Sequence, residues 1–212
     1  MIGRPAQGHR HQGSTLVHGW RFSQKGFGCA PRELFRLFLA GGDDRLPLRV
    51  AQGGEMLAPG TPEGLISYID VRDLAEFMRT CVENRVAGTY NLVNKPGTLS
   101  IGGLIETSKR VTGANPTVTW APVEFLKAQG LIAGELVSSP ALPIWDPPDG
   151  DIGNIGLVRC DRAIAQGLKL RSMEQTVRDT LEWQKSRPAA DQVLKAGLRP
   201  EREAELLKLL HG

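Results

Sequence analysis

The sequence has few cysteines, no long hydrophobic run and only a small excess of positive charge. Because no run of about 18 apolar residues occurs, no membrane-spanning helix is expected. The three cysteines, Cys29, Cys81 and Cys160, lie far apart and form no Cys-x-x-Cys pair. This argues against a disulfide framework and against a zinc site, so we expect no metal ligands and a reducing compartment, the cytoplasm by default.

The composition is that of a globular protein with one unusual end. The 212 residues can bury a sizeable core, and the hydrophobic fraction of 41% is ordinary. Residues 1–42 carry six basic side chains and a single acidic one, whereas the remainder has 20 basic against 22 acidic. The basic excess is therefore confined to the N-terminal segment.

Residues 1–43 show no sustained periodicity and are rich in glycine, arginine and histidine. We expect a basic, poorly ordered segment, or an extension unrelated to the rest of the chain. A nucleic-acid-binding arm is an alternative, since Arg10, Trp20 and Arg21 mix positive charge with an aromatic ring. The tail interpretation is preferred, and no nucleic-acid partner is expected.

The stretch from Leu65 to Val93 predicts a strand, a helix and a second strand. Residues 65–71 are an apolar, β-rich run, and residues 89–93 form another. Between them, apolar residues recur at helical spacing and are expected to form one apolar helix face, on which Cys81 is a core residue: Leu74, Phe77, Met78, Cys81 and Val82. This is the βαβ unit of a parallel sheet, which requires a larger α/β structure around it.

Later elements are marked by their ends. Ser100 and Gly113 are expected to cap a helix between them, residues 117–120 to form a strand, and Pro122 to begin a short helix. Asp161 is expected to cap a short helix. Two further helices are expected, one that begins with a capping box from Ser172 to Gln175 and one that begins at Pro200.

The segment Tyr68-Ile69-Asp70-Val71-Arg72-Asp73-Leu74-Ala75 resembles a motif of the extended short-chain dehydrogenases/reductases, the NAD-dependent epimerase/dehydratase family. Four further segments resemble motifs of that family in the same order: residues 88–93, 99–100, 160–168 and 176–183. The resemblance spans about residues 44–188 and implies the C-terminal half of such a protein. It implies an α/β fold made of an incomplete Rossmann-like parallel sheet and a small C-terminal α/β substrate lobe, followed by a helical tail, residues 189–212.

The family's cofactor loop and catalytic Tyr-x-x-x-Lys pair are not found. Tyr68 and Tyr90 are followed four residues later by Arg72 and Asn94, not by lysine. Residues 150–156 match Gly-x-x-Gly-x-x-Gly, but they follow two prolines and precede an extended segment. The resemblance implies NAD or NADP as cofactor, yet we expect no catalytic or cofactor-binding residue here and no binding by this chain alone. The sequence looks truncated or mis-started.

The resemblance also bears on the substrate. Ile66 stands where relatives acting on nucleotide sugars carry an arginine, and the loop around Asp149 lacks a second one. A carbonyl or alcohol is therefore the expected small-molecule substrate. Tyr68, Arg72 and Trp145 are the candidate substrate contacts. The alternatives are that Tyr68 and Trp145 only pack against the core.

Three functions remain open. The first is the substrate-binding half of an NAD(P)-dependent oxidoreductase or epimerase-like enzyme, inactive as this chain. The second is a non-catalytic binding module, or a homo-oligomer, that recruits a partner through an exposed sheet edge. Nucleic-acid binding is the third. Asp70 and Asp73 are expected to cap the helix that follows them, not to act as acid or base.

Overall fold

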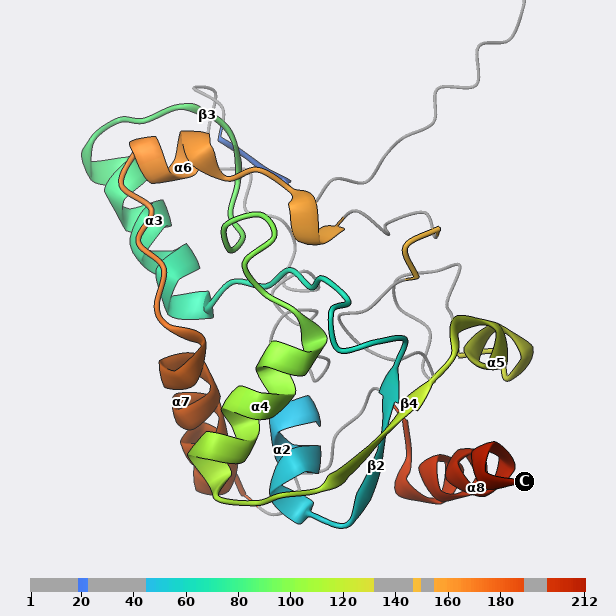
Figure 1. Ribbon diagram of the computed structural model, residues 1–212. Coiled ribbons are helices and arrows are strands. Elements are labelled where there is room, and N and C mark those ends of the chain that lie inside the picture. Colours follow the sequence, from blue (N-terminus) through green and yellow to red (C-terminus); the bar gives the residue numbers. More distant parts are fainter. Residues whose placement is uncertain (1–18, 23–44, 132–146, 150–154, 189–197) are drawn as a thin grey trace, which may run out of the picture.

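The computed structural model describes residues 19–22, 45–131, 147–149, 155–188 and 198–212 (Figure 1). These ranges combine helices with two small sheets, so the predicted α/β class is confirmed at that level. Of residues 1–43, only Gly19–Phe22 is described. The elements are β1 (Gly19–Phe22), α2 (Arg45–Gln52), β2 (Glu55–Pro59), α3 (Val71–Glu83), β3 (Gly88–Asn91), α4 (Ile101–Thr112), β4 (Thr117–Ala121), α5 (Val123–Ala128), η1 (Ile155–Leu157), α6 (Asp161–Ala165), α7 (Met173–Ser186) and α8 (Pro200–His211).

Strands β2 and β4 form a parallel pair, in register from Glu55 opposite Thr117 to Pro59 opposite Ala121. Helices α2, α4 and α7 lie on one side of this pair, and α5 and α8 lie on the other (Figure 1). Because successive side chains of a strand point to opposite faces, β2 contributes side chains to the packing on both sides of the pair. Met56 packs with the α4 side, while Leu57 packs against Leu206 of α8.

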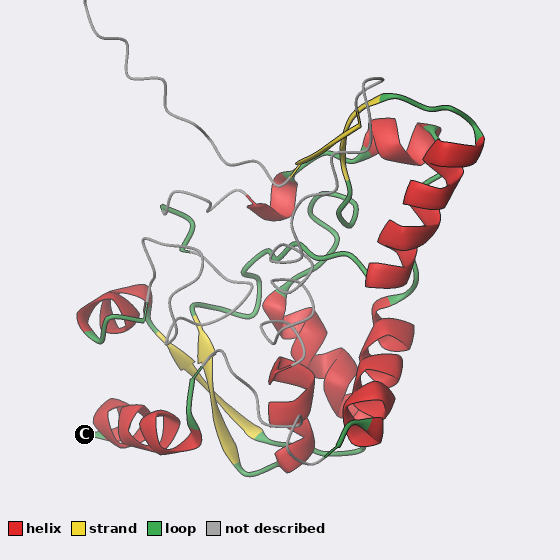
Figure 2. Ribbon diagram, turned by 180° about the vertical axis from the view of Figure 1, so that it is seen from behind, coloured by secondary structure: helices red, strands yellow, loops and turns green. Residues whose placement is uncertain are grey.

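A second group of elements surrounds its own core. Helices α3 and α6 pack with β3 around Phe77 and Tyr90, whose rings meet edge to face with centroids 5.6 Å apart. β3 pairs antiparallel with β1. The view from behind shows this group above the α2–α4–α7 layer (Figure 2). The core around α3 thus neighbours the core that α2, α4 and α7 form against the parallel pair.

The helix and the second strand of the predicted βαβ unit are confirmed as α3 and β3, but its first strand and its parallel pairing are wrong. Residues 65–70 form no strand: Leu65 makes an isolated antiparallel bridge to Ser100, and the Asn94 N–H donates to the Tyr68 carbonyl at 2.9 Å. β3 is antiparallel to β1 instead of parallel to a preceding strand. The apolar run did indicate burial, since Ile66 is fully buried. Burial, however, does not require a regular hydrogen-bonded ladder.

The predicted helix ends are mostly confirmed. Ser100 and Ser172 accept hydrogen bonds from the backbone N–H groups three residues ahead, and Pro200 is the first residue of α8. Gly113 ends α4 with φ of 72°, a left-handed conformation that favours glycine. The prediction for Asp161 is wrong, because Cys160 precedes α6 and Asp161 pairs with Arg159 instead. Among the described residues, no helix combines the length and apolar character needed to cross a membrane.

Candidate functional site

Two of the three predicted substrate contacts lie at the start of α3. They belong to a group that we call the polar cluster, which joins the start of α3 to the start of α7. Its members are Tyr68, Asp70, Arg72, Asp73, Arg171, Thr176 and Asp179. The third predicted contact, Trp145, lies outside the described residues.

Asp70 is the centre of the polar cluster, and its side chain is only 4% exposed. It caps α3 by accepting from the Arg72 backbone N–H at 2.9 Å, and it also accepts from the Arg72 guanidinium and the Thr176 hydroxyl. Burial raises the pKa of Asp70, but these hydrogen bonds outweigh it and lower the pKa to about 2. The carboxylate is therefore charged and fully occupied, as predicted for a cap.

Arg72 bridges two carboxylates. Its guanidinium lies 2.6 Å from Asp70 and 2.5 Å from Asp179 of α7, and the hydrogen bond to Asp70 is the main reason that its pKa is raised. The side chain is still 42% exposed. Arg72 can therefore meet a small ligand at the surface, but its charge is already balanced.

Asp73 does not cap α3, contrary to expectation. Its carboxylate accepts from the Arg171 backbone N–H at 2.7 Å and pairs with the Arg171 guanidinium. The same guanidinium lies 3.9 Å from Asp70. Since both carboxylates are nearly buried, Arg171 is the counter-charge that allows them to be ionised inside the protein.

Tyr68 is half-buried beside this charge network. Burial is the main cause that raises its pKa to about 12, so the phenol stays protonated at neutral pH. Asn94 holds the Tyr68 backbone from both sides, accepting from its N–H and donating to its carbonyl, each at 2.9 Å. A tyrosine with this pKa can donate a hydrogen bond to a ligand but cannot act as a base.

The described residues do not fit a dinucleotide. A pyrophosphate site needs a glycine-rich turn between a strand and a helix, yet β4 leads through Pro122 into α5, a helix of six residues. Of the predicted loop 150–156, residues 150–154 lie outside the described ranges and Ile155–Leu157 is a single 3-10 turn. The strand-to-helix turn after β4 therefore lacks the features that hold a pyrophosphate.

Metal and thiol chemistry find no support in the described part of the chain. No three His, Cys, Asp or Glu side chains there come together as metal ligands. Cys81 and Cys160 are buried free thiols, and burial raises the pKa of each. Such thiols pack as small apolar groups and are poor nucleophiles.

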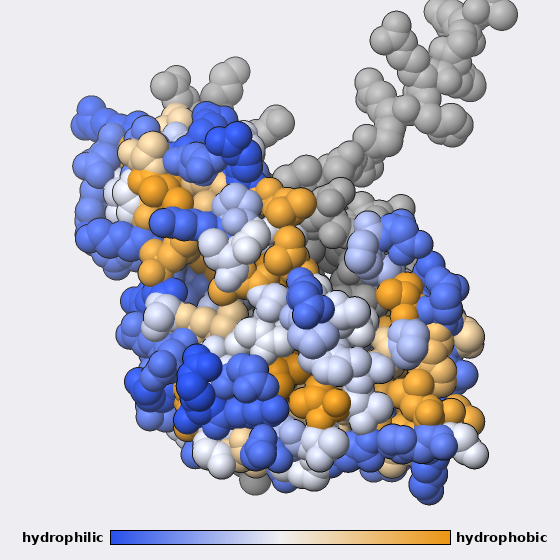
Figure 3. Space-filling view, viewed as in Figure 1, coloured by the Kyte–Doolittle hydropathy of each residue, from blue (hydrophilic) through white to orange (hydrophobic). Residues whose placement is uncertain are grey.

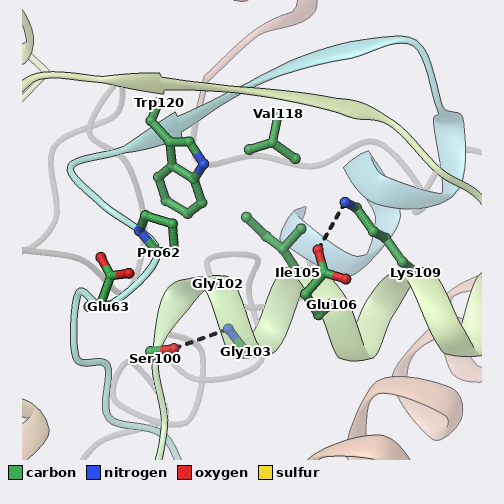
Figure 4. A pocket seen from close by; sticks show the side chains of 10 residues that line it. All are labelled: Pro62, Glu63, Ser100, Gly102, Gly103, Ile105, Glu106, Lys109, Val118 and Trp120. Carbon is green, nitrogen blue, oxygen red and sulfur yellow. Dashed lines mark hydrogen bonds and ion pairs between the residues drawn. The ribbon is translucent and has the colours of Figure 1, made fainter.

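The structure also has a surface recess that the sequence analysis did not predict. It lies between α4, β4 and the turn at Pro62, with a volume of about 540 Å³ (Figure 4). Trp120 and Val118 form one wall, and Gly102 and Gly103 form the opposite one. The adjacent glycines inside an otherwise helical pattern were the available sequence signal. Neither Tyr68 nor Arg72 lines this recess.

The comparisons with known proteins give no family. No family model matches the chain, and no curated protein matches it.

Proposed function

We propose that this chain is the substrate-binding half of an NAD(P)-dependent oxidoreductase or epimerase-like enzyme acting on a carbonyl or alcohol, and that it is inactive alone. The proposal rests on the ordered set of motifs that resemble the extended short-chain dehydrogenases/reductases. In it, Tyr68 donates a hydrogen bond to the substrate oxygen, and the exposed side of Arg72 contacts the same small molecule.

One observation carries the proposal: segments that resemble the family's motifs, although far apart in sequence, are bound to one another. Asp70 and Arg72 contact Thr176 and Asp179, about 100 positions later in the chain. β3 is tied in the same way to the segment before α6, because the Asn91 side chain donates to the Arg159 carbonyl at 3.0 Å. These contacts between the resembling segments, or next to them, are the structural support for the proposal.

The proposal is tested by two titrations of the purified chain. NADH and NADPH are expected to show no binding at micromolar concentration, measured by tryptophan fluorescence. Small carbonyl and alcohol probes, cyclohexanone and 1-phenylethanol, are expected to shift the backbone amide resonances of Tyr68 and Arg72 in NMR spectra. The variant Arg72→Met should weaken these shifts, while Arg79→Met, on an exposed part of the same helix, should not.

Either of two results would contradict the proposal. Micromolar binding of NADH or NADPH would show that the chain carries its own cofactor site. An absence of shifts at Tyr68 and Arg72 with every carbonyl and alcohol probe would remove the substrate site from this surface.

The second candidate is a non-catalytic binding module. It is favoured by one feature: within the described residues, β4 pairs only with β2, so its other edge has no strand partner. Unpaired edges accept strands from partners or from second copies. A concentration-dependent shift to dimers in size-exclusion chromatography would favour this function, and a monomer at all concentrations would oppose it.

A further inference from the structure

We propose that the recess between α4 and Trp120 binds a small organic cation with an apolar or aromatic body. This site is separate from the polar cluster and independent of the function proposed above. The inference rests on the shape of the recess, on a glycine that the packing does not require, and on the arrangement of charge at its rim.

The walls of the recess are apolar. Trp120 and Val118 project from β4 towards α4, Ile105 lies between them and the helix, and Pro62 stands beside the Trp120 ring (Figure 4). Trp120 and Val118 are only half-buried. On the outer surface, apolar side chains lie between hydrophilic ones where α4 and β4 meet (Figure 3). A volume of about 540 Å³ is within the range of small-molecule sites.

Two glycines of α4 line the recess, and the surrounding packing explains only one of them. A side chain at Gly102 would place its Cβ 2.7 Å from the Pro62 carbonyl oxygen, so the close approach of the turn requires glycine there. At Gly103, the one described group that a Cβ would meet is the Ser100 hydroxyl, at 3.3 Å, and the position is exposed. Glycine weakens a helix by about 1 kcal/mol relative to alanine. Gly103 therefore lines the recess with no side chain, although no close contact among the described residues requires glycine there.

The charges at the rim favour a cation. Lys109 is neutralised by Glu106, with Nζ and carboxylate oxygen 2.9 Å apart. Glu63 lies on the opposite side of the recess, is exposed, and has no ion pair among the described residues. Within the part of the chain that the structure describes, a ligand therefore meets the unpaired Glu63 carboxylate in a recess whose wall carries the Trp120 indole. Both attract an organic ammonium group, the carboxylate by its charge and the indole by the negative face of its ring.

The test is an NMR titration of the whole chain with three probes of similar size: benzyltrimethylammonium, benzyl alcohol and benzoate. The Trp120 indole N–H, assigned with the variant Trp120→Phe, and the Gly103 amide report on the recess. Benzyltrimethylammonium is expected to shift both resonances in the millimolar range, about threefold to fivefold more tightly than benzyl alcohol. Benzoate is expected to cause no shift.

Three variants define the site. Glu63→Gln should weaken the binding of the cation to the level of the neutral probe, because it removes only the charge of an exposed side chain. Gly103→Leu should abolish binding by filling the recess. Glu124→Gln, an exposed change on α5 outside the recess, should leave the affinity unchanged.

The proposal is overturned if benzyltrimethylammonium leaves the Trp120 indole unshifted, or if the neutral probe binds as tightly as the cation. It is equally overturned if Glu63→Gln retains the wild-type affinity. This last variant keeps the test decisive even if Gly103→Leu fails to fold. None of these results depends on NADH, NADPH, cyclohexanone or 1-phenylethanol, so the two proposals can fail separately.

Discussion

At the scale of single residues, Asp70 shows how a carboxylate can be kept inside the protein with its charge. Four hydrogen-bond donors from Arg72 and Thr176 reach it: a backbone N–H, two guanidinium nitrogens and a hydroxyl. Its pKa of about 2 lies below the ordinary value of 3.8. Because the folded protein holds the proton less tightly than the unfolded chain, Asp70 stabilises the fold above about pH 4, and this stabilisation is lost as the pH falls towards 2.

We therefore expect acid to weaken the wild-type protein more than the variant Asp70→Asn. The lowered pKa corresponds to roughly 2 kcal/mol of stabilisation at neutral pH, of which roughly half is lost at about pH 3. Asparagine still caps a helix, so the variant tests the charge more than the cap. Urea unfolding at about pH 7 and pH 3 measures the difference.

Asp161→Asn is the matched control for this measurement. Asp161 pairs with Arg159 at the exposed surface. The free energy of unfolding of Asp161→Asn should therefore depend on pH as that of the wild-type protein does. If Asp70→Asn lost as much stability in acid as the wild-type protein, Asp70 would not be the titrating group.

At the scale of elements, helix α8 provides hydrogen-bond partners for the outer edge of β2, where no strand pairs among the described residues. The Glu203 carboxylate accepts from the Leu57 N–H of β2 at 2.9 Å. Glu203 also pairs with Arg49 at 2.7 Å, and the Arg49 guanidinium donates to the carbonyls of Gly53 and Glu55. Together this ion pair supplies the donor and the acceptor that a neighbouring strand would supply, which covers an otherwise open sheet edge.

Glu203→Ala should release this edge. It leaves the buried Leu57 N–H without an acceptor, which costs about 1–3 kcal/mol. The amide of Leu57 is expected to exchange with solvent roughly ten times faster, as measured by hydrogen exchange and NMR.

Glu205→Ala serves as the control on the same helix. Glu205 is exposed, and its ion pair in the described part of the chain is with Arg202, so its loss should change neither stability nor the exchange of Leu57. Equal exchange of Leu57 in Glu203→Ala and the wild-type protein would show that another group protects this edge.

Helix α4 offers a second test at this scale, because its two adjacent glycines should respond differently to alanine. Gly102→Ala forces the Pro62 turn away from the helix and should destabilise the protein by about 1–3 kcal/mol. Gly103→Ala gains up to about 1 kcal/mol of helix propensity, with a small adjustment of the Ser100 hydroxyl. Chemical unfolding of both variants gives the comparison. Equal stabilities would contradict the close contact between α4 and the turn.

At the scale of the whole molecule, the polar cluster links two hydrophobic cores. The core around Phe77 is carried by α3 and β3, and the core around Ile105 is carried by α2, α4 and α7. Arg72 and Arg171 make the ion pairs between the start of α3 and the segment at α7. The two cores are therefore expected to unfold together only while these pairs are intact.

Arg171→Met tests this coupling. It leaves the buried Asp73 carboxylate without its guanidinium, at a cost of about 3 kcal/mol. Hydrogen exchange should then become faster in α3 and β3 than in α4, whereas all three are expected to share one slow rate in the wild-type protein. Arg178→Met, which breaks an exposed pair on α7, should leave the rates equal. A uniform loss of protection in Arg171→Met would show that the cores are joined by other contacts.

The sequence by itself determined the local features. The caps at Ser100, Ser172 and Asp70 and the first turn of α8 at Pro200 follow from hydrogen bonds and dihedral angles within a few residues. Cys81 was correctly predicted to be buried, because helical spacing sets which side chains share a face. Val82, predicted on the same face, is 51% exposed, since the neighbouring elements decide how wide the buried face is.

Only the tertiary structure decided how these pieces meet. Residues 65–70 have the composition of a strand, but the backbone that they contact is the irregular stretch from Asn94 to Ser100, so no ladder forms. The pairing of Asp73 with Arg171 joins residues 98 positions apart, and that of Glu203 with Leu57 spans 146. Local patterns carry no information on such distant partners, because the contact depends on how separate helices pack. The polar cluster, the covered edge of β2 and the recess at Trp120 all depend on this packing.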